Sequence, residues 1–124
     1  MQQCRQYRGQ MAHHAGLAAE SRIAQDYEQR GFAVARRRWR GKGGEIDLIL
    51  RDGNGLIFVE VKQSSNFDRA AESLSARQMQ RICACAAEYL ESEPLGSLTE
   101  VRFDVALIDG HGDTRIIENA FGLG

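Results

Sequence analysis

Residues 44–63 read GEIDLILRDGNGLIFVEVKQ, and this pattern predicts a β-hairpin. Two apolar-rich runs, residues 45–51 and 56–63, flank the turn sequence Asp52-Gly53-Asn54-Gly55. Asparagine and glycine favour the tight turns that join antiparallel strands, because both tolerate a positive φ. We therefore expect two neighbouring strands joined by a short loop.

The register of this hairpin gathers charged side chains on one face. A loop of two or four residues sets Asp47 opposite Glu60 and Glu45 opposite Lys62. Because side chains alternate along a strand, these four residues share one face of the hairpin. The other face is then apolar and consists of Ile46, Leu48, Leu50, Ile57, Val59 and Val61.

The opposed carboxylates need a compensating positive charge, because like charges directly opposite each other repel. Lys62 can supply it alone, as in an ordinary salt-bridged surface. The alternative is a hard divalent cation such as Mg²⁺, which binds a few carboxylate oxygens and keeps several waters. Glu20 favours the metal, since it lies on the apolar stripe of a helix predicted over residues 16–30, where a carboxylate needs a partner. Its alternative role is a first-turn acid stabilised by the helix dipole.

The rest of the chain predicts one mixed α/β domain. Residues 1–15 show no clear period and are expected to form a flexible N-terminal lead, with a single domain over residues 16–124. The other predicted elements are a strand over 32–39, a helix over 71–91 and strands over 101–108 and 114–118. The order αβββαββ predicts a single sheet with helices packed against it.

Composition excludes several classes of protein. The 124 residues are 43% apolar and carry 16 basic and 17 acidic side chains, a balance that argues for a folded core rather than disorder. The apolar runs are far shorter than the roughly 18 residues of a membrane span, so no membrane partner is expected. Without a signal-peptide pattern, we expect a cytoplasmic protein. The spacing of Cys83 and Cys85 does not match a zinc site.

A basic segment leads into the hairpin. Its cations are Arg36, Arg37, Arg38, Arg40 and Lys42. Together with Trp39 they suit phosphate contact and base stacking on a nucleic acid. The alternative is a solvated strand edge whose charges prevent aggregation.

These residues resemble the PD-(D/E)XK nuclease superfamily, whose motif is an acid on one strand followed by an acid, any residue and a lysine on the next. The motif reads here as Asp47 and then Glu60-Val61-Lys62. The flanking residues 44–49 and 58–62 look specifically like the YraN-like family of bacterial proteins, which are similar to archaeal Holliday junction resolvases. The likeness extends to Ala19-Glu20, Ser73-Leu74 and Arg102-Phe103-Asp104-Val105.

The resemblance implies a restriction-endonuclease-like fold, with a central mixed sheet flanked by helices. It implies an endonuclease that uses Mg²⁺ or Mn²⁺ to hydrolyse DNA, including branched DNA. Asp47, Glu60 and the carbonyl of Val61 would hold the metal, with Glu20 as a further ligand and Lys62 beside the attacking water. The nucleic-acid contacts would be Arg36, Arg38, Arg40 and Lys42. Paired cuts across a junction would favour a homodimer.

Two positions depart from the family pattern. Gln63 and Gln78 stand where the family usually has a basic residue after the lysine and a lysine early in the second helix. Arg69, Arg77 or Arg81 are the candidates to replace the missing charge. The departures favour an alternative function, a nucleic-acid-binding module without turnover. A third possibility is a protein–protein scaffold that uses an exposed sheet edge.

Overall fold

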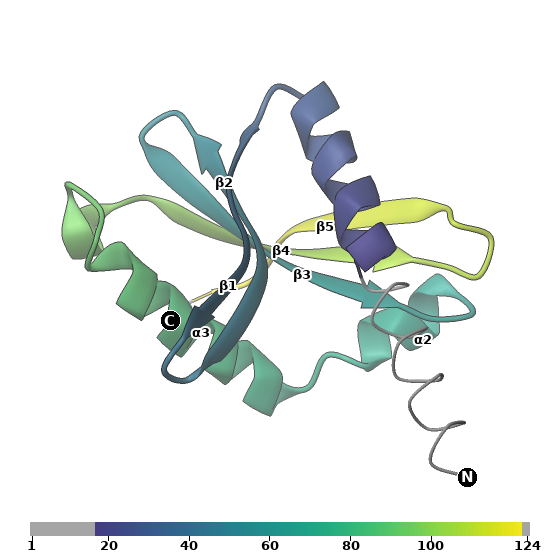
Figure 1. Cartoon of the computed structure of the whole chain (residues 1–124). Coiled ribbons are helices and arrows are strands. Elements are labelled where there is room, and N and C mark those ends of the chain that lie inside the picture. Colours follow the sequence, from purple (N-terminus) through teal and green to yellow (C-terminus); the bar gives the residue numbers. More distant parts are fainter. Residues whose placement is uncertain (1–16, 123–124) are drawn as a thin grey trace, which may run out of the picture.

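The structure is a computed structural model that describes residues 17–122 of the 124-residue chain. Its centre is a five-stranded sheet in the order β1-β2-β3-β4-β5. The strands are β1 (Ala33–Gly41), β2 (Gly44–Asp52), β3 (Gly55–Gln63), β4 (Val101–Ile108) and β5 (Thr114–Phe121). Neighbours are antiparallel except β3 and β4, which are parallel (Figure 1). The prediction of a mixed α/β arrangement is confirmed, while the predicted lead over residues 1–15 lies outside the described residues.

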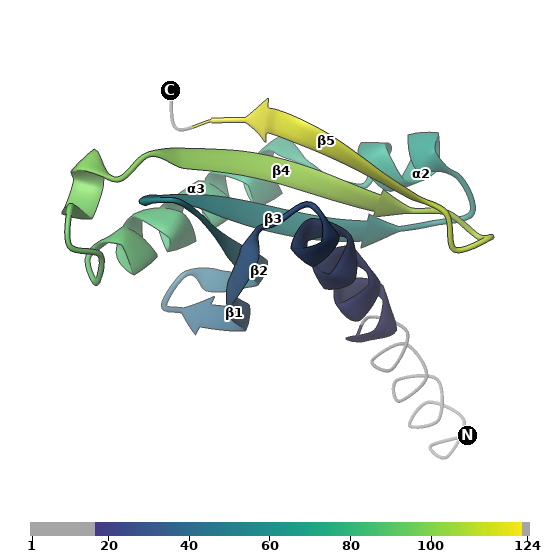
Figure 2. The same ribbon diagram turned by 90° about the horizontal axis from the view of Figure 1, so that it is seen from above.

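Helices cover both faces of this sheet. The N-terminal helix spans residues 17–29 of the described chain and is followed by Gly31, whose φ of 97° suits a helix end. In Figure 2 this helix lies on one side of the sheet, and α2 (Phe67–Glu72) and α3 (Ala76–Leu90) lie on the other. A short 3₁₀ turn, η1 (Gly96–Leu98), precedes β4. None of the helices in residues 17–122 is long and apolar enough to cross a membrane.

The helix predicted over residues 71–91 is confirmed over Ala76–Leu90, but its predicted start was wrong, because a separate short helix over Phe67–Glu72 ends before it. Asn66 caps α2 by accepting a hydrogen bond from the Arg69 N–H. Ser75 then starts α3 with a capping box, in which its hydroxyl and the Gln78 side chain exchange hydrogen bonds with each other's backbone. Ser75 and Gln78 thus mark the start of α3 as a separate helix.

Both faces of the β2–β3 hairpin are apolar near its turn. On one side, the N-terminal helix forms a core with Leu48, Leu50, Ile57 and Val59. On the other side, α3 forms a core with residues that include Ile49 and Phe58. The prediction of one apolar and one charged face was therefore wrong for the half of the hairpin next to the turn, since Ile49 and Phe58 belong to the face expected to be charged. The charged side chains occupy only the end of the hairpin far from the turn.

The register of the hairpin is the predicted one near the turn. Asp52 pairs with Gly55 across a two-residue loop, and the pairing continues to Leu48 and Val59. Gly53 has a φ of 59° in this loop, a conformation that glycine adopts without steric cost.

The predicted pairs of Asp47 with Glu60 and of Glu45 with Lys62 do not form, because the β2–β3 ladder ends before them. The carboxylate of Asp47 accepts a hydrogen bond from the Val61 N–H at 2.8 Å. A side-chain oxygen thus takes the place of a backbone acceptor, and the two strands separate at this point.

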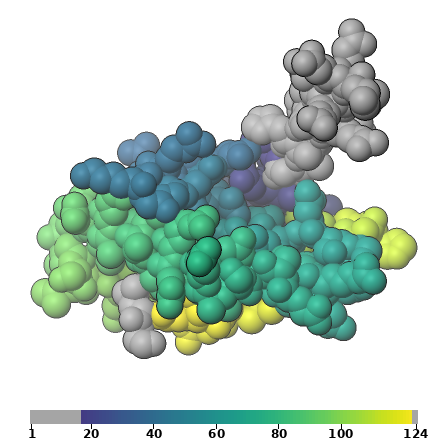
Figure 3. All heavy atoms as spheres, turned by 90° about the horizontal axis from the view of Figure 1, so that it is seen from below, coloured from purple at the N-terminus to yellow at the C-terminus, as the bar shows by residue number. Residues whose placement is uncertain are grey.

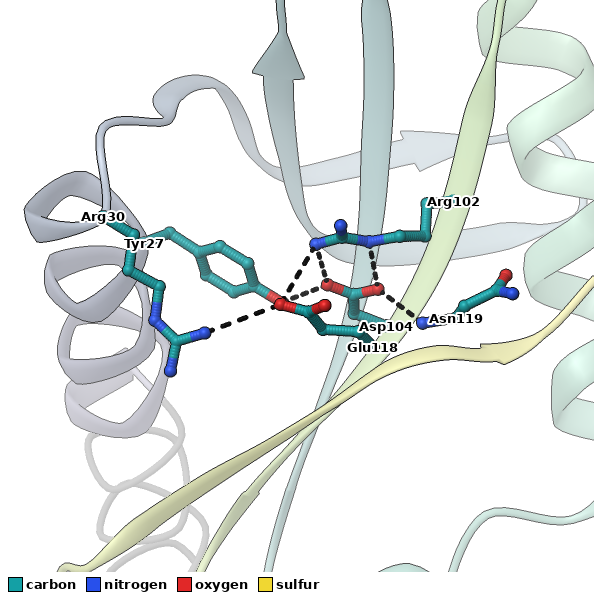
Figure 4. A network of polar contacts seen from close by, with 6 residues as sticks. All are labelled: Tyr27, Arg30, Arg102, Asp104, Glu118 and Asn119. Carbon is teal, nitrogen blue, oxygen red and sulfur yellow. Dashed lines mark hydrogen bonds and ion pairs between the residues drawn. The ribbon is translucent and has the colours of Figure 1, made fainter.

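A buried polar network ties the N-terminal helix to β4 and β5 (Figure 4). Asp104 is fully buried and accepts hydrogen bonds from the Tyr27 hydroxyl at 2.7 Å and from the Arg102 guanidinium at 2.8 Å. It also accepts the Asn119 N–H at 3.0 Å, where β5 bulges and Asn119 has a φ of 52°. A buried carboxylate needs such partners, and here the Tyr27 and Asn119 contacts join it to the N-terminal helix and to β5.

Candidate functional site

A cleft of about 210 Å³ opens where β2 and β3 separate. It lies between the β1–β2 hairpin and the first half of α3, which are adjacent on the face seen in Figure 3. The lining residues are Arg38, Glu45, Asp47, Glu60, Gln78, Arg81 and Ile82. Nearly all of these side chains are polar or charged, which sets the cleft apart from the apolar cores on either side.

The backbone of Val61 holds Asp47 in place at the cleft. The hydrogen bond from the Val61 N–H fixes the Asp47 carboxylate between β2 and β3. Within a strand, the N–H and C=O of one residue point toward the same neighbouring strand. The carbonyl of Val61 therefore faces the side on which Asp47 lies.

Asp47 and Glu60 form a close, largely buried carboxyl pair. Burial raises the pKa of both groups, and the charge of Asp47 and a hydrogen bond between the two carboxyls raise the pKa of Glu60 further, to about 8. Lys62 acts in the opposite direction, with its Nζ 3.5 Å from Glu60 Oε1 and its side chain 18% exposed. One lysine thus faces two carboxyls, so burial and mutual repulsion favour the protonated form of the pair more than Lys62 alone offsets.

The N-terminal helix brings Glu20 to the same region. Glu20 is only 7% exposed, and burial together with the charge of Asp47 raises its pKa to about 7. The helix does not lie over the face expected to be charged, because its core lies on the opposite side of the sheet. Glu20 nevertheless lies close enough to feel the charges of Asp47 and Glu45.

Arg38 and Arg40 are partners of acidic side chains. Arg38 Nε lies 3.0 Å from Glu45 Oε1 and 3.8 Å from Glu20 Oε1. Arg40 lies 3.6 Å from Glu45 Oε2, but its side chain is 81% exposed. Glu45, to which the sequence assigned no role, is therefore the anchor for two of the predicted nucleic-acid contacts.

The remaining predicted contacts, Arg36 and Lys42, are exposed and do not belong to the residues that line the cleft. The structure places them on β1 and in the β1–β2 turn, beside the site rather than within it.

Helix α3 contributes Gln78 and Arg81 to the cleft, which sequence patterns only partly indicated. The side chain of Gln78 is held in the helix cap, where it accepts the Ser75 N–H at 3.1 Å. Arg81 lies three residues later, which places it on the same helix face, and it lines the cleft. Of the three candidates to replace the missing lysine, Arg81 alone is among the lining residues of the described chain.

The oxygen donors of the cleft fit a hard divalent cation. Among residues 17–122, no three His, Cys, Asp or Glu side chains converge into a complete metal site. Asp47, Glu60 and the Val61 carbonyl still offer oxygen ligands of the kind that Mg²⁺ and Mn²⁺ accept, and such ions keep several waters. Two adjacent buried carboxyls also have too little compensating charge, which a divalent cation would supply.

Comparison with known proteins places this site within a bacterial family. The model of Uncharacterised protein family UPF0102 matches residues 19–108, which include all the lining residues of the cleft. The chain belongs to this family. A UPF0102 protein of Ruegeria pomeroyi is 62% identical over 94% of this chain and 95% of its own length. UPF0102 proteins of Cereibacter sphaeroides and Roseobacter denitrificans are 56% and 48% identical, over 91% and 97% of this chain and 97% and 93% of their own lengths.

Proposed function

We propose that this UPF0102 protein is a metal-dependent endonuclease that hydrolyses DNA phosphodiester bonds. The observation that carries the proposal is the buried carboxyl pair of Asp47 and Glu60, with Lys62 beside it in a cleft that Arg38 and Arg81 also border. The resemblance of these residues to the PD-(D/E)XK motif supports it and extends the proposal to a restriction-endonuclease-like fold.

Each group in the cleft has a physical role in such a reaction. Asp47, Glu60 and the carbonyl of Val61 would hold Mg²⁺ or Mn²⁺, with Glu20 nearby as a further acid. When bound, the ion supplies a Lewis acid that polarises the scissile phosphate and lowers the pKa of water. Lys62 would either orient the attacking water as an ammonium group or, as a neutral amine, accept its proton at Nζ. In its charged form it would help to stabilise the negative charge that builds on the phosphate.

Cleavage of labelled DNA tests this proposal. The substrates are a four-way junction, a flap, a linear duplex and a single strand, each with Mg²⁺, Mn²⁺ or EDTA. Asp47→Asn should abolish cleavage while leaving the fold intact, because it keeps the shape of the ligand and removes its charge. Asp52→Asn, an exposed position at the end of the same strand, is the matched control and should cut like the native chain. Cleavage retained by Asp47→Asn would rule out this assignment.

The second candidate function is a nucleic-acid-binding module without turnover. Gln78 favours it, because its side chain is engaged in the helix cap and brings no positive charge to the cleft. Binding of the same substrates without cleavage under every metal would establish this candidate in place of the nuclease.

Branched DNA is the substrate that the resemblance favours, and it brings an expectation of a homodimer. Two coordinated cuts across a junction need two active sites, which a two-fold dimer provides. Preferential cutting of the four-way junction, together with a dimeric mass in solution, would support this part of the proposal.

A further inference from the structure

Arg38 has an unusual backbone conformation beside the cleft. Its φ is 49°, in the left-handed region that non-glycine residues seldom adopt. The β1–β2 ladder pairs Arg37 with Leu48 and Trp39 with Ile46 but skips Arg38, which stands across from Asp47. The local break in β1 thus coincides with the position of Asp47, and Arg38 lines the cleft.

The guanidinium of Arg38 serves two carboxylates from different elements. Its Nε lies 3.0 Å from Glu45 on β2 and 3.8 Å from Glu20 on the N-terminal helix. Its side chain is 36% exposed, so it can leave this position without rearrangement of a core. Arg40 differs, because it contacts Glu45 from a side chain that is 81% exposed.

We propose that Arg38 is the counter-ion of these carboxylates in the metal-free protein and transfers to a substrate phosphate when a divalent cation binds. The inference rests on the proposed function and adds a link between its two ligands. A divalent cation held by Asp47 and Glu60, with Glu20 as a further ligand, would compete with the guanidinium for Glu20. It would also repel the guanidinium, which feels the charge of Asp47. A phosphate is an equally suitable bidentate partner for the released arginine.

The exchange makes metal and DNA binding cooperative. A metal that frees Arg38 raises the affinity for phosphate, and by linkage DNA that engages Arg38 raises the affinity for metal by the same factor. Without DNA, Arg38 opposes the metal. Its removal should therefore strengthen metal binding and weaken DNA binding, whereas removal of a merely structural arginine would weaken both or neither.

The test is calorimetric titration of the full chain with Mn²⁺ in the absence of DNA. Arg38→Asn is the informative variant, because asparagine tolerates the left-handed conformation and carries no charge. We expect it to bind Mn²⁺ on the order of tenfold more tightly than the native chain. Arg38→Lys, which keeps the charge, should stay close to the native affinity. Arg22→Gln is the control, since Arg22 is exposed on the N-terminal helix and does not line the cleft, and it should leave the affinity unchanged.

A second measurement uses a labelled DNA duplex on a Lys62→Met background, which prevents cleavage during the titration. Mn²⁺ should raise the DNA affinity of Lys62→Met several-fold, and adding Arg38→Asn should remove that dependence on Mn²⁺. If Arg38→Asn does not fold by circular dichroism, Arg38→Gly provides the same loss of charge at a positive φ.

The outcomes separate this inference from the proposed function. Mn²⁺ binding by the native chain that is unchanged or weaker in Arg38→Asn would overturn the exchange and leave the metal site standing. Failure of both proteins to bind Mn²⁺ would overturn the metal site and the exchange together.

Discussion

Two carboxyl groups of the candidate site, Glu20 beside the cleft and Glu60 within it, make the stability of the protein depend on pH. The pKa of Glu20 is raised from 4.5 to about 7 and that of Glu60 to about 8. Between these limits the folded protein holds protons that the unfolded chain has already released. The contribution of these two groups to the free energy of unfolding, measured without divalent cations, should therefore be fully present below about pH 4.5. It should be lost as the pH rises to about 8.

Urea denaturation at several pH values checks this dependence. Glu60→Gln should flatten the decline, because an amide carries no titrating proton. Glu72→Gln, an exposed position on α2, is the control and should keep the native slope. An unchanged slope in Glu60→Gln would show that the carboxyl pair is not the source.

Exposed arginines beside the cleft should set the salt dependence of DNA binding. Each phosphate contact contributes about one unit to the slope of log affinity against log salt concentration. Arg40→Ala should reduce that slope by roughly one unit, because its side chain projects from the site into solvent. Arg22→Ala, on the exposed side of the N-terminal helix, should leave the slope unchanged. A DNA-binding constant that does not change with salt would contradict the prediction that these arginines contact phosphates.

The sequence predicted the acidic residues of the site better than its basic ones. Asp47, Glu60 and Lys62 follow from strand alternation and motif spacing, and Glu20 from its place on an apolar stripe. The structure places Arg38 among the carboxylates through a positive φ that no residue type at that position signals. Arg81 becomes part of the cleft only through the packing of α3.

Among the secondary-structure elements, β4 depends on the buried charge of Asp104. The Tyr27 hydroxyl donates one of the hydrogen bonds that keep this carboxylate satisfied, and it comes from the N-terminal helix. Tyr27→Phe should lower the free energy of unfolding by about 2 kcal/mol, because it removes a hydrogen bond to a buried charged group.

Chemical denaturation of a matched pair checks this cost. Tyr89→Phe makes the same change in α3, where the ring packs edge-on against Trp39 and Phe58. It should cost less than about 0.5 kcal/mol, as expected away from a charged partner. Equal costs for the two variants would show that the bond to Asp104 does not anchor the helix.

The order of the strands was predictable, but the separate helix α2 and the assignment of faces were not. Hydrophobic periodicity indicated the hairpin and its turn, and the β2–β3 ladder confirms that register near the turn. Alternation assigned Ile49 and Phe58 to a charged face because it cannot show that a second helix covers them. The break at Asp47 depends on a side chain that replaces a backbone acceptor, which strand patterns do not contain.

For the whole molecule, a bound divalent cation should act as a stabilising ligand. It would join carboxylates on β2 and β3 that otherwise repel, and it would bind the folded chain in preference to the unfolded one. At a concentration of about 100 times its dissociation constant, it should add about 2.7 kcal/mol to the free energy of unfolding.

Scanning calorimetry with Mg²⁺, Mn²⁺ or EDTA measures this stabilisation. The native chain should unfold at a higher temperature with metal than with EDTA, and the gain should be larger at pH 8 than at pH 5, where protons compete for the carboxylates. The Glu60→Gln variant should show little gain. The same gain in native and variant chains would indicate that the metal binds elsewhere.

Both outer strands of the sheet are interrupted. β1 changes register between Val34 and Arg36, and β5 changes register opposite Phe103 and Val105. An edge strand from a second molecule would meet an irregular backbone at β1 and at β5. These irregularities oppose edge-to-edge pairing of the sheets of two molecules. The protein should therefore resist fibril growth at high concentration, and recognition of a partner should depend on side chains rather than on a shared backbone ladder.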